Sequence, residues 1–263
     1  MNDIITSNLK GGLGNFLFQI SASFAYSKKY KKNLMFNSSI AYIVHQNIEH
    51  YKDNIFSKLP FQKDIQRYDT LYTEQSFEYN EIPFFNGSVY LDGYFQSEKY
   101  FLNFRNDLLY LFDIGEINKS IINEKYFDLI KKNTCSIHVR RGDYLNHPDV
   151  HPTLSLDYYK QTISHFNNDV TFLVFSDDIK WCKENLKTLS DKLVYIEGNS
   201  DFQDMYLMSI CKNNIICNST FSWWGAWLNN NQNKIVVAPK TWFGPAHANY
   251  NINDLYCEGW VKI

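Results

Sequence analysis

The chain has 263 residues, with 26 lysines and arginines against 28 aspartates and glutamates, and its formal net charge is −2. This length is enough for one large domain or two compact ones that bury their own core. A nearly balanced charge lacks the basic excess of proteins that neutralise many phosphates, which argues against nucleic acid as a partner. Aromatic residues make up 17% of the chain, so we expect a dense core, an aromatic surface, or both.

The cysteines and the apolar segments indicate the cellular compartment in which we expect the protein. Five cysteines with no C-x-x-C pair fit neither a disulfide framework nor a zinc site, so we expect them to be reduced and mostly buried. The chain has no run of about 18 apolar residues, and its start does not resemble a signal peptide. We therefore expect a soluble, cytoplasmic protein without a transmembrane segment. Peripheral association with the inner face of the membrane stays open.

The first elements in chain order predict a βαβ unit. Residues 4–9 read as a strand, residues 10–15 as a glycine-rich loop, and the following residues as a helix with an apolar residue at every fourth position. Residues 34–36 read as the next strand. A strand, a loop, a helix and a second strand in so short a stretch indicate parallel strands with a right-handed crossover.

The rest of the chain changes pattern near residues 125–133. Before this point the pattern is weak, with a strand expected at residues 90–94 and a helix at residues 103–112. After it, strands and amphipathic helices alternate, which is typical of a doubly wound parallel sheet. The expected strands are residues 134–140, 170–176, 193–196, 215–218 and 235–238, and the expected helices are residues 156–167, 179–189, 202–212 and 221–229. The fold class is therefore α/β, with domains at residues 1–130 and 131–263.

Polar segments follow three of the expected strands in the second half. They are residues 138–144, 176–178 and 218–222. Ligands of open parallel sheets bind beyond the carboxyl ends of the strands, so we expect these segments to form one site.

The residue types in these segments favour a nucleotide diphosphate as ligand. Arg140 and Arg141 carry planar guanidinium groups that can hold phosphate oxygens in bidentate fashion. Ser219 and Thr220 lie at an expected helix start, where hydroxyl and backbone N–H groups can bind an anion.

Each of these features also has a structural interpretation. His138 lies in an apolar strand, as a core histidine would, and Arg141 could simply pair with Asp143 or Asp177. Asp177 and Asp178 precede an expected helix, which favours a capping role over magnesium binding.

The glycine loop and the tryptophans also have structural interpretations. The glycine loop lacks the third glycine of the dinucleotide fingerprint and the lysine of a Walker loop, so a tight turn explains it equally well. Trp223, Trp224 and Trp227 have helical spacing, which favours a core position over a stacking surface.

Three motifs in the right order resemble glycosyltransferase family 11, the α1,2-fucosyltransferases. They are Gly-Gly-Leu-Gly-Asn at residues 11–15, His-Val-Arg-Arg-Gly-Asp-Tyr at residues 138–144, and Asn-Ser-Thr-Phe-Ser-Trp-Trp-Gly-Ala-Trp at residues 218–227. The resemblance implies an inverting, metal-independent transfer of L-fucose from GDP-β-L-fucose to the 2-hydroxyl of a galactose in a glycan acceptor. It implies a GT-B-like fold, in which two Rossmann-like domains with parallel sheets face each other across a cleft, and a role in bacterial polysaccharide or O-antigen biosynthesis.

The resemblance also assigns roles to individual residues. It places the acceptor side and the glycine loop in residues 1–130 and the GDP-fucose site in residues 131–263, with no metal or other cofactor. Catalytic roles fall on Arg140, Asp143 and Asn15. Donor contacts fall on His138, Arg140, Arg141, Gly12, Gly14, Asn15, Asp204, Asn218, Ser219, Thr220 and Ser222. Asp204, expected just before a helix, would face the guanine edge.

The loop departs from the family at one position. Phe16 stands where the family usually has glutamine, so polar contacts from that position are not carried over.

The general base is not fixed by the motifs. Asp143 is the positional candidate, with an equally good role as a partner of the arginines, and Asp149 and His151 follow it in the chain.

Two other classes of function remain open at this stage. One is a different enzyme on a Rossmann-like fold, such as a sulfotransferase or a dehydrogenase, because a fold does not fix a function. The other is a non-catalytic carbohydrate-binding protein that uses the aromatic residues to stack on sugars. Residues 68–101 are the aromatic segment in which we expect the acceptor site.

Overall fold

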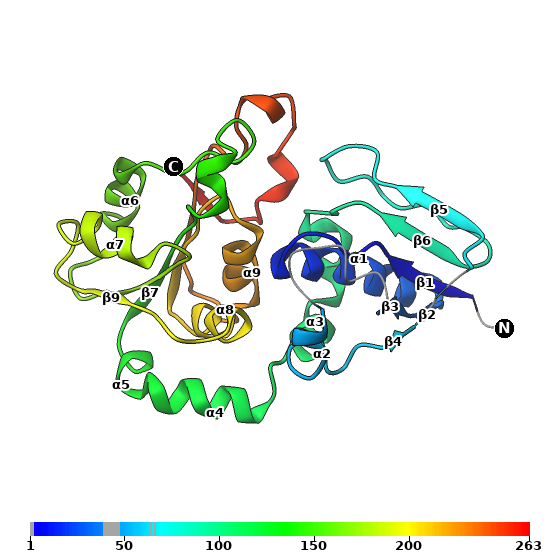
Figure 1. Ribbon diagram of the computed structural model, residues 1–263, viewed down its shortest axis with the longest axis horizontal. Coiled ribbons are helices and arrows are strands. Elements are labelled where there is room, and N and C mark those ends of the chain that lie inside the picture. The colour runs from blue at the N-terminus through cyan, green and yellow to red at the C-terminus, as the bar shows by residue number, and fades with distance from the viewer. Residues whose placement is uncertain (1–2, 39–47, 64, 66) are drawn as a thin grey trace. The chain divides into compact units, whose positions relative to one another are not determined.

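The computed structural model describes residues 3–38, 48–63, 65 and 67–263, and these form two compact α/β units (Figure 1). The first unit is the chain up to Gly115 together with Tyr250–Cys257, and the second is Glu116–Asn249 with Glu258–Ile263. The change of unit lies ahead of the expected boundary at residue 130. The reason is that Ile122 and Tyr126 pack into a core cluster of the second unit, against Leu207 and Met208.

The first unit contains a four-stranded parallel sheet in the order β2-β1-β6-β5 and a separate parallel pair, β3 and β4. The elements are β1 (Ile4–Ser7), α1 (Leu13–Tyr30), β2 (Asn33–Leu34), β3 (Phe36–Asn37), α2 (Glu49–Lys52), β4 (Phe61–Gln62), β5 (Thr70–Thr73), β6 (Val89–Asp92) and α3 (Arg105–Leu111). The βαβ unit is confirmed. The strand expected at residues 34–36 divides in two, because Leu34 pairs with β1 whereas Phe36 pairs with β4.

The second unit contains a six-stranded parallel sheet in the order β12-β11-β10-β7-β8-β9. Its elements are α4 (Glu116–Lys125), α5 (Phe127–Ile130), β7 (Thr134–Val139), α6 (Leu156–Ile163), β8 (Thr171–Ser176), α7 (Ile179–Asn185), β9 (Leu193–Tyr195), α8 (Asp201–Ser209), β10 (Asn213–Ile215), α9 (Thr220–Leu228), β11 (Val236–Ala238) and β12 (Val261–Lys262). The doubly wound pattern is confirmed. The strand order reverses between β7 and β10, and such a switch point is where ligands of these sheets bind.

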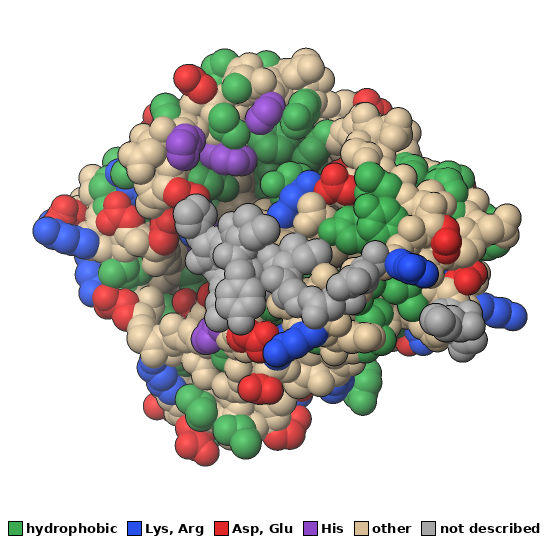
Figure 2. Space-filling model, turned by 45° about the vertical axis from the view of Figure 1, so that its right-hand side comes forward, with side chains coloured by type: hydrophobic (Ala, Val, Ile, Leu, Met, Phe, Trp, Pro, Cys, Tyr) green, Lys and Arg blue, Asp and Glu red, His purple; other side chains and the backbone are tan. Residues whose placement is uncertain are grey.

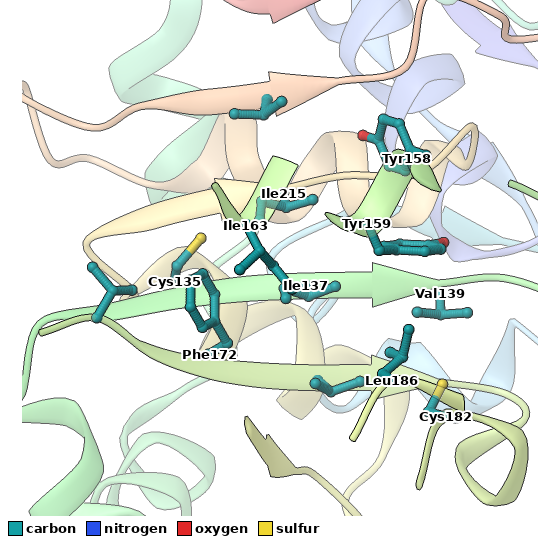
Figure 3. Packing of buried hydrophobic residues seen from close by; sticks show 13 residues of the cluster. Cys135, Ile137, Val139, Tyr158, Tyr159, Ile163, Phe172, Cys182, Leu186 and Ile215 are labelled. Atoms are coloured by element: carbon teal, nitrogen blue, oxygen red, sulfur yellow. The ribbon is translucent and has the colours of Figure 1, made fainter. Parts of the chain in front are cut away.

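The core of the second unit explains why β7 lies in the middle of its sheet. All six residues of β7 are buried, and Figure 3 shows Ile137 and Val139 packed among side chains of the neighbouring strand and helices. Trp223, Trp224 and Trp227 are at most 2% exposed, which confirms that these tryptophans belong to the core.

The expectation that most of the cysteines are buried is confirmed. Among the five cysteines, Cys135, Cys182, Cys211 and Cys217 are buried, Cys257 is partly buried, and none forms a disulfide. In the described part of the chain, no helix has the length and apolar character needed to cross a membrane.

The position of Ile137 yields a prediction for stability. Replacing Ile137 by alanine would leave a cavity beside the central strand, so we expect the free energy of unfolding to fall by about 2–5 kcal/mol in urea titrations. Ile117 is 79% exposed, and alanine at that position should change the free energy by less than about 0.5 kcal/mol. Equal losses for the two variants would contradict the placement of β7 in the core.

Candidate functional site

The carboxyl ends of β7, β8 and β10 lie side by side in the second unit. Val139, the last residue of β7, pairs with Ser176, the last residue of β8. On the other side, Ile137 pairs with Ile215, the last residue of β10. The structure therefore brings together the three polar segments at residues 138–144, 176–178 and 218–222.

Arg140 is the cationic centre of this edge. Its Nη2 lies 2.8 Å from Oδ1 of Asp143, and its Nε lies 3.2 Å from Oδ2 of Asp177. Burial by itself lowers the pKa of Arg140, but the carboxylates of Asp177 and Asp143 outweigh it and raise the pKa above its ordinary value. The guanidinium is therefore charged and held in one orientation. No interaction within the described residues engages its Nη1, which leaves donors for a ligand.

Arg141 does not pair through its side chain with Asp143 or Asp177, the two partners considered from the sequence. Its Nε lies 3.2 Å from Oδ2 of Asp178, and its guanidinium lies 3.9 Å from the centre of the Trp181 ring. Its backbone N–H donates to Oδ1 of Asp177 over 2.9 Å. Arg141 thus fixes the loop after β7 to the loop after β8.

The two aspartates after β8 have structural roles. Oδ1 of Asp178 accepts the backbone N–H of Trp181, which confirms the expected cap of α7. Oδ2 of Asp177 binds Arg140, and a Cβ at Gly142 would lie 2.5 Å from this oxygen, so a side chain there would push the carboxylate away from its place. Within the described residues, no group of three or more histidine, cysteine or acidic side chains is arranged to hold a metal ion.

His138 has the surroundings of a core histidine. It is 5% exposed, and its Nδ1 lies 3.1 Å from Sγ of Cys217. Burial, with a smaller effect of Arg140, lowers the pKa of His138 to about 3, so the ring is neutral at pH 7. His138 therefore supports the strand end that carries Arg140.

Most polar side chains of the segment after β10 already have hydrogen-bond partners in the protein. Asn218 donates to the carbonyl oxygens of Pro152 and Trp242, the Ser219 hydroxyl accepts the N–H of Phe221, and the Ser222 hydroxyl donates to the Ser219 carbonyl. Thr220, the first residue of α9, is the member of this segment whose side chain has no hydrogen bond among the described residues. An anion here would meet Thr220 and the N-terminus of α9.

Asp204 lies inside the first turn of α8, within the helix expected at residues 202–212 and not ahead of it. Its Oδ1 accepts a hydrogen bond of 2.8 Å from Nδ2 of Asn199. Burial raises the pKa of Asp204 to about 6, although Asn199 acts in the opposite direction. A carboxylate that is hard to solvate gains much from a ligand that donates hydrogen bonds to it.

The glycine loop belongs to the first unit. Gly11 has a φ of 88°, and a Cβ there would collide with the Asn15 side chain, so the turn requires glycine. Gly12 caps α1, and Gly14 is buried in its first turn. Oδ1 of Asn15 accepts a hydrogen bond from Gln96, which leaves the Asn15 amide nitrogen for other partners.

A further polar group, not indicated by the sequence, lies at the carboxyl edge of the first sheet. Nζ of Lys10 lies 2.8 Å from Oδ1 of Asp92 and 5.1 Å from the centre of the Tyr94 ring, which is 39% exposed. Phe95 has a φ of 53°, rare for a non-glycine residue, and Glu74 holds this turn by accepting the N–H groups of Tyr94 and Phe95. The strand β5, which brings Glu74 here, has a sequence too short and too exposed to be recognised.

Comparisons with known proteins agree over almost the whole chain. The family model described as "Glycosyl transferase family 11" matches residues 2–263. The chain is 33% identical to an alpha-1,2-colitosyltransferase of Escherichia coli, over 99% of each protein. It is 32% identical to the O-antigen biosynthesis glycosyltransferase WbnK of Escherichia coli, over 98% of this chain and 99% of that protein. It is 23% identical to galactoside alpha-(1,2)-fucosyltransferase 2 of Oryctolagus cuniculus, over 98% of this chain and 76% of that protein.

Solved structures show the same architecture. The structure of NodZ alpha-1,6-fucosyltransferase co-crystallized with GDP, a Bradyrhizobium protein, matches with a TM-score of 0.56 at 12% identity, over 86% of this chain and 92% of NodZ. At this identity the likeness concerns the fold alone. It confirms that the fold is GT-B-like, with parallel sheets of α/β type.

Proposed function

The chain belongs to glycosyltransferase family 11, and from this premise we propose that it transfers L-fucose from GDP-β-L-fucose to the 2-hydroxyl of a galactose residue in a glycan. The transfer inverts the anomeric carbon and needs no metal or other cofactor. The observation that carries the proposal is the oriented Arg140 guanidinium at the strand-order switch of the second unit. The O-antigen enzyme among the relatives supports a bacterial surface-glycan pathway and a cytoplasmic location.

The leaving GDP determines what the donor site has to do. As the bond between fucose and the β-phosphate breaks, negative charge grows on the phosphate and the sugar becomes oxocarbenium-like. Without a metal, side chains and helix N-termini must balance this charge. Nη1 of Arg140 offers oriented donors, and Thr220 at the start of α9 offers a hydroxyl and a backbone N–H. Asp143 and Asp177 keep the guanidinium aimed while the phosphate accumulates charge.

The guanine base is assigned to Asp204. Guanine presents two neighbouring N–H donors on its Watson–Crick edge, and a carboxylate can accept both. Asp204 is partly buried and has a single hydrogen bond, from Asn199, so it retains acceptor capacity.

The acceptor is assigned to the first unit, at the patch formed by Lys10, Asp92 and Tyr94. An exposed aromatic ring can stack on the apolar face of a galactose, and the flanking ion pair can bind its hydroxyls. Asn15 borders the same sheet edge, and its amide nitrogen would contact the reacting sugar.

A second donor is favoured by one observation. The relative with 33% identity is a colitosyltransferase, and colitose is L-fucose without its 3-hydroxyl. GDP-colitose is therefore the alternative donor, and a direct comparison of the two nucleotide sugars decides between them.

The first prediction concerns the reaction itself. The chain, incubated with EDTA, GDP-fucose or GDP-colitose and a panel of β-galactosides, should release GDP and form an α1,2-linked product. Arg140→Ala should lower kcat by about 10²–10³ because it removes a donor to the leaving phosphate, with the fold retained in circular dichroism. Arg67→Ala, which changes an exposed arginine elsewhere, is the matched control. Half of the wild-type turnover in Arg140→Ala would refute the role of Arg140, and absence of both transfer and GDP binding in the wild type would refute the function.

The second prediction concerns Asp204 and pH. Because the pKa of Asp204 is raised to about 6, the carboxylate that accepts guanine donors is present above this pH and lost below it, so GDP affinity should weaken as the pH falls through 6. Asp204→Asn should weaken GDP binding by about 10–150-fold at pH 7.5 and remove this pH dependence. Calorimetric titration measures both, with Asp157→Asn, an exposed position in the same unit, as control. An unchanged affinity in Asp204→Asn would place guanine elsewhere.

The third prediction concerns the acceptor. Tyr94→Ala should raise the KM for the galactoside about tenfold, the effect of losing roughly 50 Å² of apolar contact, and leave the Kd for GDP unchanged. Tyr110→Ala, at a tyrosine that is 70% exposed in the same unit, should change neither constant. If Tyr94→Ala instead weakens GDP binding and spares the acceptor KM, the patch belongs to the donor.

A further inference from the structure

The segment after the arginine motif is held firmly against the strand ends. Within it, the backbone N–H of His151 donates to the His147 carbonyl over 2.8 Å. The Val150 carbonyl accepts the N–H of Gly244 over 2.9 Å, and the Pro152 carbonyl accepts Nδ2 of Asn218. His151 therefore has a fixed position next to the edge that carries Arg140.

The ring of His151 is fixed as well. It stacks on Tyr144 with 4.8 Å between ring centres and an angle of 17° between the planes, and it contacts Phe243 at 5.9 Å. The Tyr144 hydroxyl donates to the Asn218 carbonyl over 2.9 Å, which anchors the stack. A histidine on a solvated loop needs no such support.

The two ring nitrogens of His151 differ in their surroundings. Nδ1 is enclosed by protein and has no hydrogen-bond partner among the described residues. Nε2 also has no partner there, but it is not among the enclosed atoms, so it is open to a ligand. A neutral imidazole with its proton on Nδ1 would present a free lone pair at Nε2.

Burial is the main reason why His151 is neutral. Burial lowers its pKa below the ordinary value, His247, His147 and Arg140 lower it further, and Asp143 raises it. Figure 2 shows histidine side chains gathered beside hydrophobic ones on one face of the molecule. Because the charge of Asp143 favours the protonated ring, it would partly balance a proton that His151 takes up.

We propose that His151 is the general base of the transfer, a role that rests on the proposed function. The acceptor oxygen forms a bond to the anomeric carbon of the donor sugar while the bond from this carbon to the β-phosphate oxygen breaks. The electron pair of that bond leaves with GDP. The proton of the acceptor hydroxyl moves to Nε2 of His151, and the Asp143 carboxylate balances the resulting imidazolium.

This assignment gives Asp143 a different task from that of a base. Oδ1 of Asp143 lies 3.0 Å from Nε and 2.8 Å from Nη2 of Arg140, so this oxygen already serves the arginine. A proton taken up by Asp143 would weaken the ion pair that orients the guanidinium. His151 has no such commitment.

The test compares His151→Gln with His147→Gln, an exposed histidine on the same segment. In His151→Gln we expect kcat for transfer to fall about 10²–10⁴-fold at pH 7.5, with the Kd for GDP and the melting temperature close to the wild-type values. His147→Gln should keep the wild-type kcat. Added imidazole should restore part of the activity of His151→Ala.

The pH profile of kcat separates a base from a merely structural residue. The wild-type rate should fall at low pH with an apparent pKa below 6.5, because His151 must be neutral. Asp143→Asn removes the group that raises the pKa of His151, so this acid limb should move to lower pH even though the rate is reduced. In His151→Gln the limb should disappear.

The possible results distinguish a failure of the His151 role from a failure of the proposed function. Full activity in His151→Gln, an acid limb that persists in His151→Gln, or one that keeps its position in Asp143→Asn would overturn the role of His151 alone. A wild-type chain that transfers no sugar to any galactoside would overturn the proposed function and this inference together.

Discussion

The candidate site of the second unit depends on one interaction, the pairing of the Arg140 guanidinium with the carboxylates of Asp143 and Asp177. Asp143 follows the arginine on the same loop, whereas Asp177 directly follows β8, the neighbouring strand of the sheet. The pair fixes a charge that would otherwise move with a long side chain, and leaves one nitrogen of the guanidinium unused. Because the neighbouring carboxylates offset much of the positive charge, a phosphate here would be recognised by aimed donors rather than by a general electrostatic attraction.

The buried sheet beneath this edge supplies the geometry. Each residue of β7 is buried, so the strand has one register, and its end delivers Arg140 beside Asp177. Next to the arginine, His138 is neutral and lies 3.1 Å from Sγ of Cys217, a residue just after β10, so its ring adds no competing cation there. The same edge carries Tyr144, whose ring supports His151. Core packing, charge orientation and the proposed proton transfer thus depend on the same strand end.

The sequence was a good guide to this architecture where hydrophobic periodicity was strong and a poor one where it was weak. The alternating strands and helices of the second half, the buried tryptophans and the meeting of three polar segments all followed from the pattern. The short, half-exposed strand β5 did not, because its four residues carry no alternation that separates it from a loop. Because β5 is not recognisable from the sequence, neither is the role of Glu74 or the strained turn at Phe95. The sequence also does not show that Arg141 pairs with Asp178, since ion-pair partners depend on distances that only the folded chain defines.

The division of labour in the proposed site follows from which polar groups are already engaged. Ser219 and Ser222 hold the start of α9, while Thr220, Arg140 and Asp204 keep capacity for a ligand. The central claim is that Arg140 recognises the β-phosphate of GDP, and calorimetric titration of the wild-type chain with GDP and with GMP tests it most directly. If Arg140 has this role, GDP should bind at least tenfold more tightly than GMP, since charge-assisted hydrogen bonds contribute about 1.5–3 kcal/mol. Equal affinities for the two nucleotides would contradict it.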